Sequence, residues 1–140
     1  MKILGTISGT TVGGRDGSGS SSDGKMSIEF ALPKELGGKG KEGVTPEHLF
    51  ALGYSACFGS ALQYVAGQKK VKLPEDFSVT AEVSLCTNDA GGFALQVKLN
   101  VDLPGLNHAV GEELVTIAHT VCPYSNAIKG NVPVELTVTT

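Results

Sequence analysis

The chain has 140 residues, a net charge of −3 and a pI near 5.5. This length suits one domain, expected over residues 1–140, and the lack of a basic stripe argues against a nucleic-acid partner. No apolar run is expected to reach the ~20 residues that span a bilayer. The apolar N-terminal stretch is too short for a signal peptide, so the sequence predicts a cytoplasmic protein without a membrane partner.

The first third of the chain is expected to contribute strands. Residues 1–12 are rich in β-branched side chains and predict a strand, and the turn "GGRDG" follows at 13–17. Apolar and polar residues alternate through 25–32, which is strand periodicity. Residues 33–44 are polar and glycine-rich and predict a loop.

A helix is expected to begin after Thr45. Thr45 can cap it, Pro46 suits the first helical position and Glu47 suits the helix dipole. His48 stands where a full capping box would have Glu or Gln. Residues 49–66 are apolar on nearly every side, which predicts a buried helix.

The rest of the chain alternates between strand and helix patterns. Residues 77–85 and 93–101 alternate with period two around a glycine turn and predict a hairpin. A second amphipathic helix is expected over 107–122, and a last strand over 132–138. These elements predict an α+β fold in which antiparallel sheets pack around two main helices.

The three cysteines differ in context. Cys57 lies within the first apolar helix, where packing as a small hydrophobe is the plain interpretation. Cys122 precedes Pro123, which disfavours helix at the residue before it, so this thiol is expected at a break where it can move. A buried helix end explains Cys122 equally well. Strand alternation directs Cys86 away from the core.

Metal and phosphate sites are poorly supported. His119 and Cys122 have helical spacing for a metal half-site, but the chain has three histidines and lacks a second cluster. The glycine-rich residues 11–20 lack the context and the ending of a phosphate-binding loop. We therefore expect neither a metal nor a cofactor.

Three stretches come in the order and spacing of one family. They are "GGRDG" at 13–17, "TPEHLFALGYSACF" at 45–58 and "HTVCPYSNAIKGN" at 119–131. With them, the sequence resembles the organic hydroperoxide resistance proteins, within the wider family that includes the osmotically inducible OsmC proteins. The resemblance implies a thiol peroxidase that reduces organic hydroperoxides to alcohols. It also implies an intertwined homodimer that lipoylated proteins regenerate in preference to glutathione.

Four residues match the functional positions of that family. Cys57 falls on the peroxidatic cysteine and Cys122 on the resolving cysteine. Arg15 falls on the arginine that supports the thiolate, and Glu47 on the glutamate that orients this arginine. Cys86 matches no family site.

The sequence departs from the family at three places. Thr45 replaces a common Asn, and both residues can cap a helix. Gly59 and Ser60 stand where a larger side chain is often found, which can reshape the substrate pocket. Ile128 and Lys129 replace Thr-Arg, which can affect the surface where the reductant docks.

The implied roles agree with thiol chemistry. A thiolate attacks the peroxide oxygen, and burial alone would raise the pKa of Cys57. A guanidinium such as that of Arg15 lowers it, and the Glu47 carboxylate can aim the guanidinium bidentately. Attack leaves Cys57 as sulfenic acid, and Cys122 condenses with it to a disulfide that a dithiol reductant reopens.

Side-chain type suggests the substrate. The apolar residues Phe50, Phe58 and Tyr124 would favour an alkyl or lipid hydroperoxide over hydrogen peroxide. Two other functions stay open: a stress-induced binding or structural protein with inert thiols, and a general thiol–disulfide oxidoreductase. The absence of a Cys-x-x-Cys motif counts against the oxidoreductase.

Helix geometry predicts a site shared between two chains. Glu47 and Cys57 lie ten positions apart, about 15 Å along one helix, which is too far for one arginine fork to hold both. Antiparallel packing of two copies of this helix would bring Glu47 of one chain near Cys57 of the other. The sequence leaves open which chain supplies Arg15.

Overall fold

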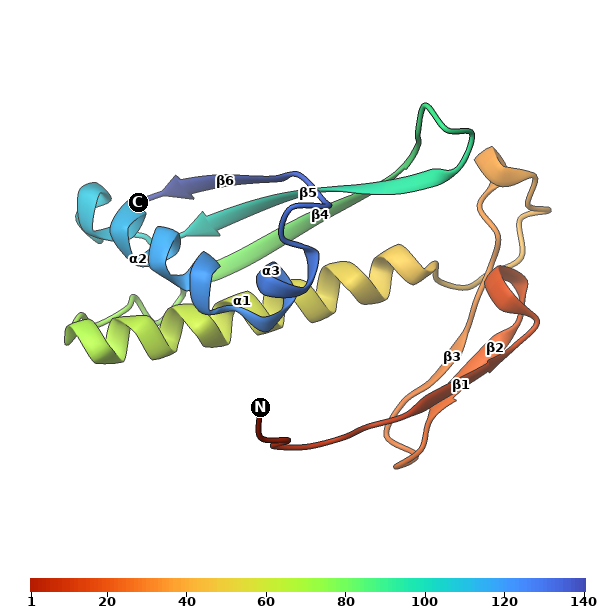
Figure 1. Ribbon diagram of the computed structural model, residues 1–140, viewed down its shortest axis with the longest axis horizontal. Helices are drawn as coiled ribbons and strands as arrows, with labels where there is room; N and C mark the ends of the chain where they lie inside the picture. Colours follow the sequence, from red (N-terminus) through yellow and green to blue (C-terminus); the bar gives the residue numbers. More distant parts are fainter. The chain divides into compact units, whose positions relative to one another are not determined.

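The computed structural model describes residues 1–140 and divides into two compact units, residues 1–48 and residues 49–140 (Figure 1). Each unit has its own three-stranded sheet, and the helices belong mostly to the second. The α+β class expected from the sequence is confirmed.

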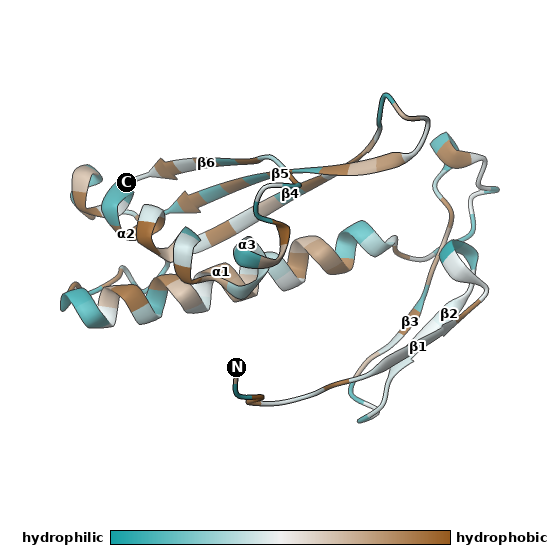
Figure 2. Cartoon of the chain, in the orientation of Figure 1, coloured by the Kyte–Doolittle hydropathy of each residue, from teal (hydrophilic) through white to brown (hydrophobic).

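The first unit is a small antiparallel sheet. Its strands are β1 (Gly9–Val12), β2 (Ser18–Ser21) and β3 (Ser27–Glu29), in the order β1-β2-β3. The strand expected over 1–12 begins only at Gly9, and β2 was not predicted. β2 consists of serine and glycine, so no hydrophobic period marks it, and Figure 2 shows β1 and β2 mostly in pale, neutral colours.

The turn between β1 and β2 presents Arg15 on a short 3-10 helix, η1 (Gly14–Asp16). Gly13 adopts a φ of 83°, in the left-handed region that favours glycine. A Cβ at Gly17 would collide with the carbonyl oxygen of Val12. The turn therefore needs glycine on both sides of Arg15. A second 3-10 helix, η2 (Lys34–Leu36), lies within the polar loop after β3.

The second unit has the sheet order β4-β5-β6, with β4 (Ser78–Thr87), β5 (Phe93–Asp102) and β6 (Val134–Thr139). The predicted hairpin is confirmed, since β4 and β5 pair antiparallel over ten positions. β6 pairs parallel to β5, so the expectation of purely antiparallel sheets was wrong. The helices between β5 and β6 form the crossover that a parallel pair requires.

One face of this sheet is apolar. The register pairs inward positions with one another across all three strands. These positions are Val79, Ala81, Val83, Val97, Leu99, Val101, Val134, Leu136 and Val138. Cys86 pairs with Ala94 on the opposite face, as the alternation predicted.

The structure has the two helices expected from the sequence and one additional short helix. α1 spans Pro46–Lys69, and in Figure 1 it lies along the strands of the second sheet. α2 spans His108–Val121, and its N-cap Asn107 accepts a hydrogen bond from the Val110 N–H at 3.1 Å. α3 (Pro123–Ile128) was not predicted, because a proline start and six residues leave little periodicity.

α1 is buried on one side only. Tyr54, Phe58 and Leu62 are fully buried in the core, at spacings of four residues. Leu52 is 70% exposed and Tyr64 is 59% exposed. The expectation that α1 is buried on nearly every side was therefore wrong for a single copy of the chain. We call the exposed positions Leu52, Ala56, Ser60 and Tyr64 the outer strip.

By length and composition alone, α1 is long and apolar enough to cross a membrane, contrary to the sequence expectation. Its buried side belongs to the hydrophobic core, and core helices pass the same test.

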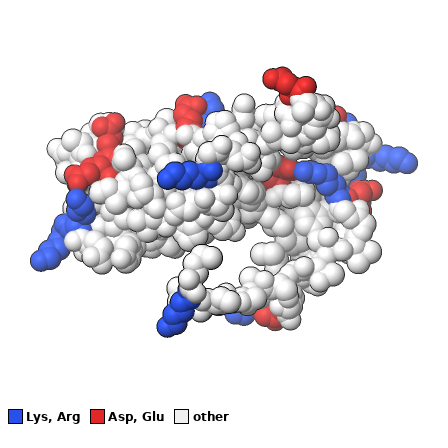
Figure 3. All heavy atoms as spheres, in the orientation of Figure 1, with Lys and Arg blue, Asp and Glu red and all other residues white.

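Charges of both signs are scattered over the face shown in Figure 3, without a basic stripe.

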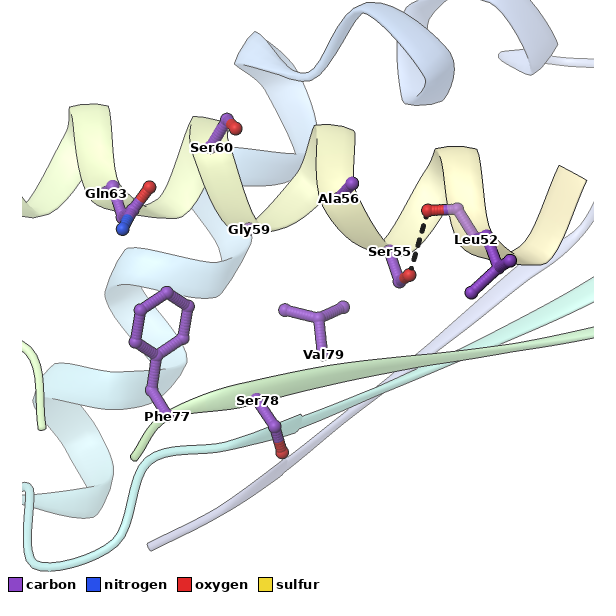
Figure 4. Close-up of a pocket in the computed structure, with 9 residues that line it drawn as sticks. All are labelled: Leu52, Ser55, Ala56, Gly59, Ser60, Gln63, Phe77, Ser78 and Val79. Carbon is purple, nitrogen blue, oxygen red and sulfur yellow. Dashed lines mark hydrogen bonds between the residues drawn. The ribbon is translucent and has the colours of Figure 1, made fainter. Parts of the chain in front are cut away.

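A cavity of about 410 Å³ lies between α1 and β4 in the second unit. Figure 4 shows Val79 of β4 and Phe77, which precedes β4, directed towards the helix at Gly59. A Cβ at Gly59 would lie 3.9 Å from each of these side chains, an ordinary contact distance. Gly59 is therefore a helical glycine with room for a side chain.

We expect Gly59→Ala to raise the free energy of unfolding by about 0.5–1 kcal/mol, because glycine is a poorer helix former than alanine. Urea denaturation measures the change. Gly67→Ala is the matched control, because a Cβ there meets no atom within 4 Å and reports helix propensity alone. Destabilisation by Gly59→Ala together with stabilisation by Gly67→Ala would show that the cavity is filled in solution.

Candidate active site

Cys57 and Cys122 lie side by side in the second unit. Cys57 projects from α1, and Cys122 lies between α2 and α3. The Cys122 thiol donates to the Cys57 sulfur over 3.5 Å, and both thiols are free. Cys122 is fully buried. A disulfide has an S–S distance of about 2.05 Å, so oxidation of the pair to a disulfide would need only a short approach of the two sulfurs.

Pro123 shapes this arrangement. Cys122 has φ −60° and ψ 123°, an extended conformation that ends α2, as expected for a residue before proline. Pro123 has no N–H, so Tyr124 supplies the first free backbone N–H at the start of α3. This N–H lowers the pKa of the Cys57 thiol.

The pKa of Cys57 is nevertheless raised. Burial is the main cause, and the neighbouring Cys122 adds to it. Within residues 49–140, no cation opposes these effects. Within this group of residues, burial therefore disfavours the Cys57 thiolate.

Arg15 and Glu47 pair within the first unit. The two guanidinium nitrogens of Arg15 donate to the two Glu47 carboxylate oxygens at 2.9 and 2.6 Å. The Arg15 hydrogen bonds are the main reason why the pKa of Glu47 falls to about 2. The same pairing raises the pKa of Arg15. The pair is a fixed bidentate fork, with the Arg15 side chain 34% exposed.

His48 holds the start of α1. The Thr45 N–H donates to His48 Nδ1 at 3.0 Å, and the Thr45 hydroxyl lies 2.8 Å from the same nitrogen. His48 thus does what Glu or Gln does in a capping box. The sequence suggested an incomplete cap, whereas the structure shows a histidine completing it beside Glu47.

The three aromatic residues expected at the substrate site lie in two environments. Phe50 makes T-shaped contacts with Tyr54 and Tyr124, whose rings are tilted against each other, and the ring centroids lie about 6 Å apart. Phe58 is fully buried, and its ring lies 6.5 Å from that of His119. Gly53 allows this packing, because a Cβ there would lie only 2.8 Å from the Tyr124 hydroxyl oxygen.

A cavity of about 530 Å³ opens beside Cys57. Its other lining residues are Ser60, Ala61, Tyr64, Val121 and Pro123. Sequence reasoning missed Tyr64 and Val121. Tyr64 lies seven residues, or about two helical turns, after Cys57, so helix periodicity could have placed both on one side of α1.

A buried hydrogen-bond chain lies next to the thiols. Tyr54 Oη and Ser125 Oγ are 2.8 Å apart, and His119 Nδ1 lies 2.9 Å from the same Ser125 oxygen. His119, considered above as a metal half-site with Cys122, therefore uses this nitrogen to bind Ser125. The sequence did not predict these hydrogen bonds, because nothing in its pattern pairs residues 54 and 125.

Comparisons with known proteins define the family. The family model described as OsmC-like protein matches residues 38–137. An organic hydroperoxide resistance protein of Xanthomonas axonopodis pv. citri is 45% identical over 98% of this chain and 96% of its own. The chain belongs to the OsmC-like family, within the group of organic hydroperoxide resistance proteins.

Solved structures of similar proteins share the fold. The crystal structure of an organic hydroperoxide resistance protein OsmC from Legionella pneumophila is 48% identical and has a TM-score of 0.93, with 99% of this chain and 100% of that chain covered. A Vibrio cholerae structure, 43% identical with a TM-score of 0.91, covers 99% of this chain and 94% of its own. It holds captopril in one of its active sites.

The Arg15–Glu47 pair should persist in acid. The pKa of Glu47 is depressed from 4.5 to about 2, so the stability that the pair adds is complete above about pH 4.5 and is lost as the pH falls towards 2. We expect a carboxyl-carbon NMR titration of Glu47 to have its midpoint near 2 and Arg15→Ala to move it up towards 4.5.

Lys41→Ala is the control for this titration. Lys41 donates to the Asp16 carbonyl in the same unit, so its removal changes a neighbouring charge without touching the fork. A Glu47 midpoint near 4.5 in the unsubstituted protein would show that the fork is absent in solution.

Proposed function

We propose that the protein is a thiol peroxidase that reduces organic hydroperoxides to alcohols. The observation that carries this proposal is the 3.5 Å Cys57–Cys122 sulfur pair beside a cavity. Membership of a group whose relatives are named organic hydroperoxide resistance proteins supports the substrate class. The reaction needs no cofactor, because both electrons come from the two thiols.

The reaction has three steps. The Cys57 thiolate attacks the terminal peroxide oxygen, the O–O bond breaks, and the leaving alkoxide takes a proton to become the alcohol. Cys57 is left as sulfenic acid. The Cys122 sulfur then bonds to the Cys57 sulfur, and the sulfenic hydroxyl leaves with the thiol proton as water. A dithiol reductant, for which we propose a lipoylated protein, reopens the disulfide.

In this proposal the Arg15 guanidinium supplies a positive charge to Cys57, and Glu47 orients the guanidinium. Burial raises the pKa of Cys57, so a guanidinium beside it would restore the thiolate. Glu47 holds the guanidinium in a fixed orientation and leaves the Arg15 side chain partly exposed. The pair costs little reorganisation when it acts, because its geometry exists beforehand.

We also propose that the active protein is a homodimer with shared sites. The outer strip of α1, which includes Leu52 and Tyr64, leaves apolar surface exposed in one chain. A second copy of α1, packed antiparallel, would cover it and bring the partner's Glu47 towards Cys57. We place the protein in the cytoplasm, where thiols are kept reduced.

The proposed substrate is apolar. The cavity beside Cys57 presents the Tyr64 ring and the Val121 side chain. A bulky hydroperoxide gains about 25 cal/mol for each Å² of apolar surface buried there, and hydrogen peroxide has no such surface. Phe50, Phe58 and Tyr124 are proposed to support this apolar environment from the core side.

Cysteine variants test the function directly. With a lipoylated protein as reductant, we expect turnover of cumene hydroperoxide to be faster than that of hydrogen peroxide and Cys57→Ser to abolish it. Cys122→Ser should allow one reduction event and leave Cys57 as sulfenic or sulfinic acid, which mass spectrometry detects.

Cys86→Ser is the matched control, because Cys86 lies on the opposite face of the sheet and should be silent. Unchanged turnover in Cys57→Ser would refute the assignment. A protein with inert thiols would consume no peroxide, and a general oxidoreductase would exchange disulfides without preferring an organic hydroperoxide.

Mixing two inactive variants tests the shared site. We expect Cys57→Ser and Glu47→Ala chains, each inactive alone, to recover part of the activity when combined, because one site of the heterodimer is then intact. Subunit exchange is verified by native mass spectrometry. Confirmed exchange without recovered activity would mean that each site uses Glu47 and Cys57 of one chain.

A further inference from the structure

We propose that Ser125 is a positioning residue for the disulfide-forming step, because its hydroxyl joins Tyr54 and His119 into a brace that keeps Cys122 within reach of Cys57. The proposal rests on the function proposed above and adds residues that act through Cys122 and do not touch the substrate. We call Tyr54, Ser125 and His119 the brace.

The brace connects the three helices that meet at the thiols. Tyr54 lies on α1 three residues before Cys57, His119 lies on α2 three residues before Cys122, and Ser125 lies on α3 three residues after it. Each member is thus about one helical turn from a thiol. Ser125 bonds to the other two members at 2.8 and 2.9 Å.

The hydrogens of the brace have an arrangement that satisfies all three members. Burial, with the charge of Lys129, lowers the pKa of His119, which favours a neutral ring whose Nδ1 can accept. In that tautomer Ser125 donates to His119 and the Tyr54 hydroxyl donates to Ser125.

Burial makes this chain a strong constraint. Tyr54 is fully buried and Ser125 is 2% exposed, and no buried side-chain nitrogen or oxygen in the structure lacks a partner. Removing one hydroxyl would leave a buried polar group unpaired at a cost of about 1–3 kcal/mol. The three helices are therefore held together at this point by polar contacts in addition to apolar packing.

The junction at Cys122 needs such a brace. The Cys122 N–H bonds to the Ala118 carbonyl at 2.8 Å, and its carbonyl accepts from the Asn126 N–H at 3.0 Å. Pro123 supplies no N–H, so the backbone is less restrained there than within a helix. The Ser125 side chain adds a fixed point one turn further on.

The position of the Cys122 sulfur decides between two reactions of the Cys57 sulfenic acid. Cys122 can form the disulfide with loss of water, or a second hydroperoxide can oxidise Cys57 to sulfinic acid and itself become an alcohol. Attack by a held sulfur is fast because its orientation is already set. A loosened Cys122 slows the first reaction and leaves the second unchanged.

The test separates the two oxidation steps in the full-length protein. With cumene hydroperoxide, we expect Ser125→Ala to keep the rate of Cys57 oxidation within about twofold and to slow disulfide formation about tenfold, the equivalent of ~1.4 kcal/mol. The sulfinic fraction of Cys57 should rise accordingly. Rapid quenching at timed intervals, followed by thiol alkylation and mass spectrometry, measures these quantities.

Three further variants sharpen the test. Tyr54→Phe should shift the partition in the same direction, and the double variant should slow disulfide formation by less than the product of the single effects, because both break one chain. Ser55→Ala is the control, since that hydroxyl bonds only to the Leu52 carbonyl of its own helix. It should leave both steps unchanged.

The inference and the proposed function fail in different ways. Disulfide formation as fast in Ser125→Ala as in the unsubstituted protein overturns the brace, and so does equal slowing of both steps. If the protein consumes no peroxide, the proposed function is overturned. The brace is then tested by measuring the Cys57–Cys122 disulfide at equilibrium with dithiothreitol. There, Ser125→Ala should lower the stability of the Cys57–Cys122 disulfide about tenfold relative to Ser55→Ala.

Discussion

The break between Cys122 and Pro123 is the constraint on which the site depends. Proline ends α2, and the extended Cys122 places its sulfur 3.5 Å from that of Cys57. The same residue leaves the Tyr124 N–H free to lower the pKa of Cys57. Because α3 starts there, Ser125 also falls one turn away, where it meets α1 and α2. One local backbone rule thus arranges both thiols and their surroundings.

The burial of the two thiols opposes formation of the Cys57 thiolate. Burial that brings the sulfurs together also raises the pKa of Cys57 and disfavours the thiolate. A single backbone N–H does not reverse the shift. In the proposed function the Arg15–Glu47 fork is the counterweight, and the pKa of Glu47 near 2 keeps its carboxylate charged and the fork intact throughout the physiological range. A fork on a short glycine-bounded turn can do this with little strain of its own.

Sequence reasoning succeeded where a local rule decides the structure. The β4–β5 hairpin follows period-two alternation, and the end of α2 follows Pro123. It failed where pairing is decided at long range: β2 has no hydrophobic pattern, and β6 lies parallel to β5 because of the crossover that precedes it. At the site, motif order assigned roles to the two cysteines, whereas the contact between Ser125 and Tyr54 joins residues 71 positions apart that no pattern links.

The uniform apolarity of α1 has a physical explanation in its several neighbours. One side, with Phe58 and Leu62, packs into the core below the sheet. A second side, with Cys57 and Ala61, lines the cavity where an apolar hydroperoxide is proposed to bind, and Tyr64 of the outer strip borders the same cavity. The outer strip, with Leu52 and Tyr64, stays largely exposed within one chain. A helix that packs into a core and, as proposed, also faces a substrate and a second chain has few positions for charged residues. This accounts for a hydropathy of α1 that reaches that of a membrane span.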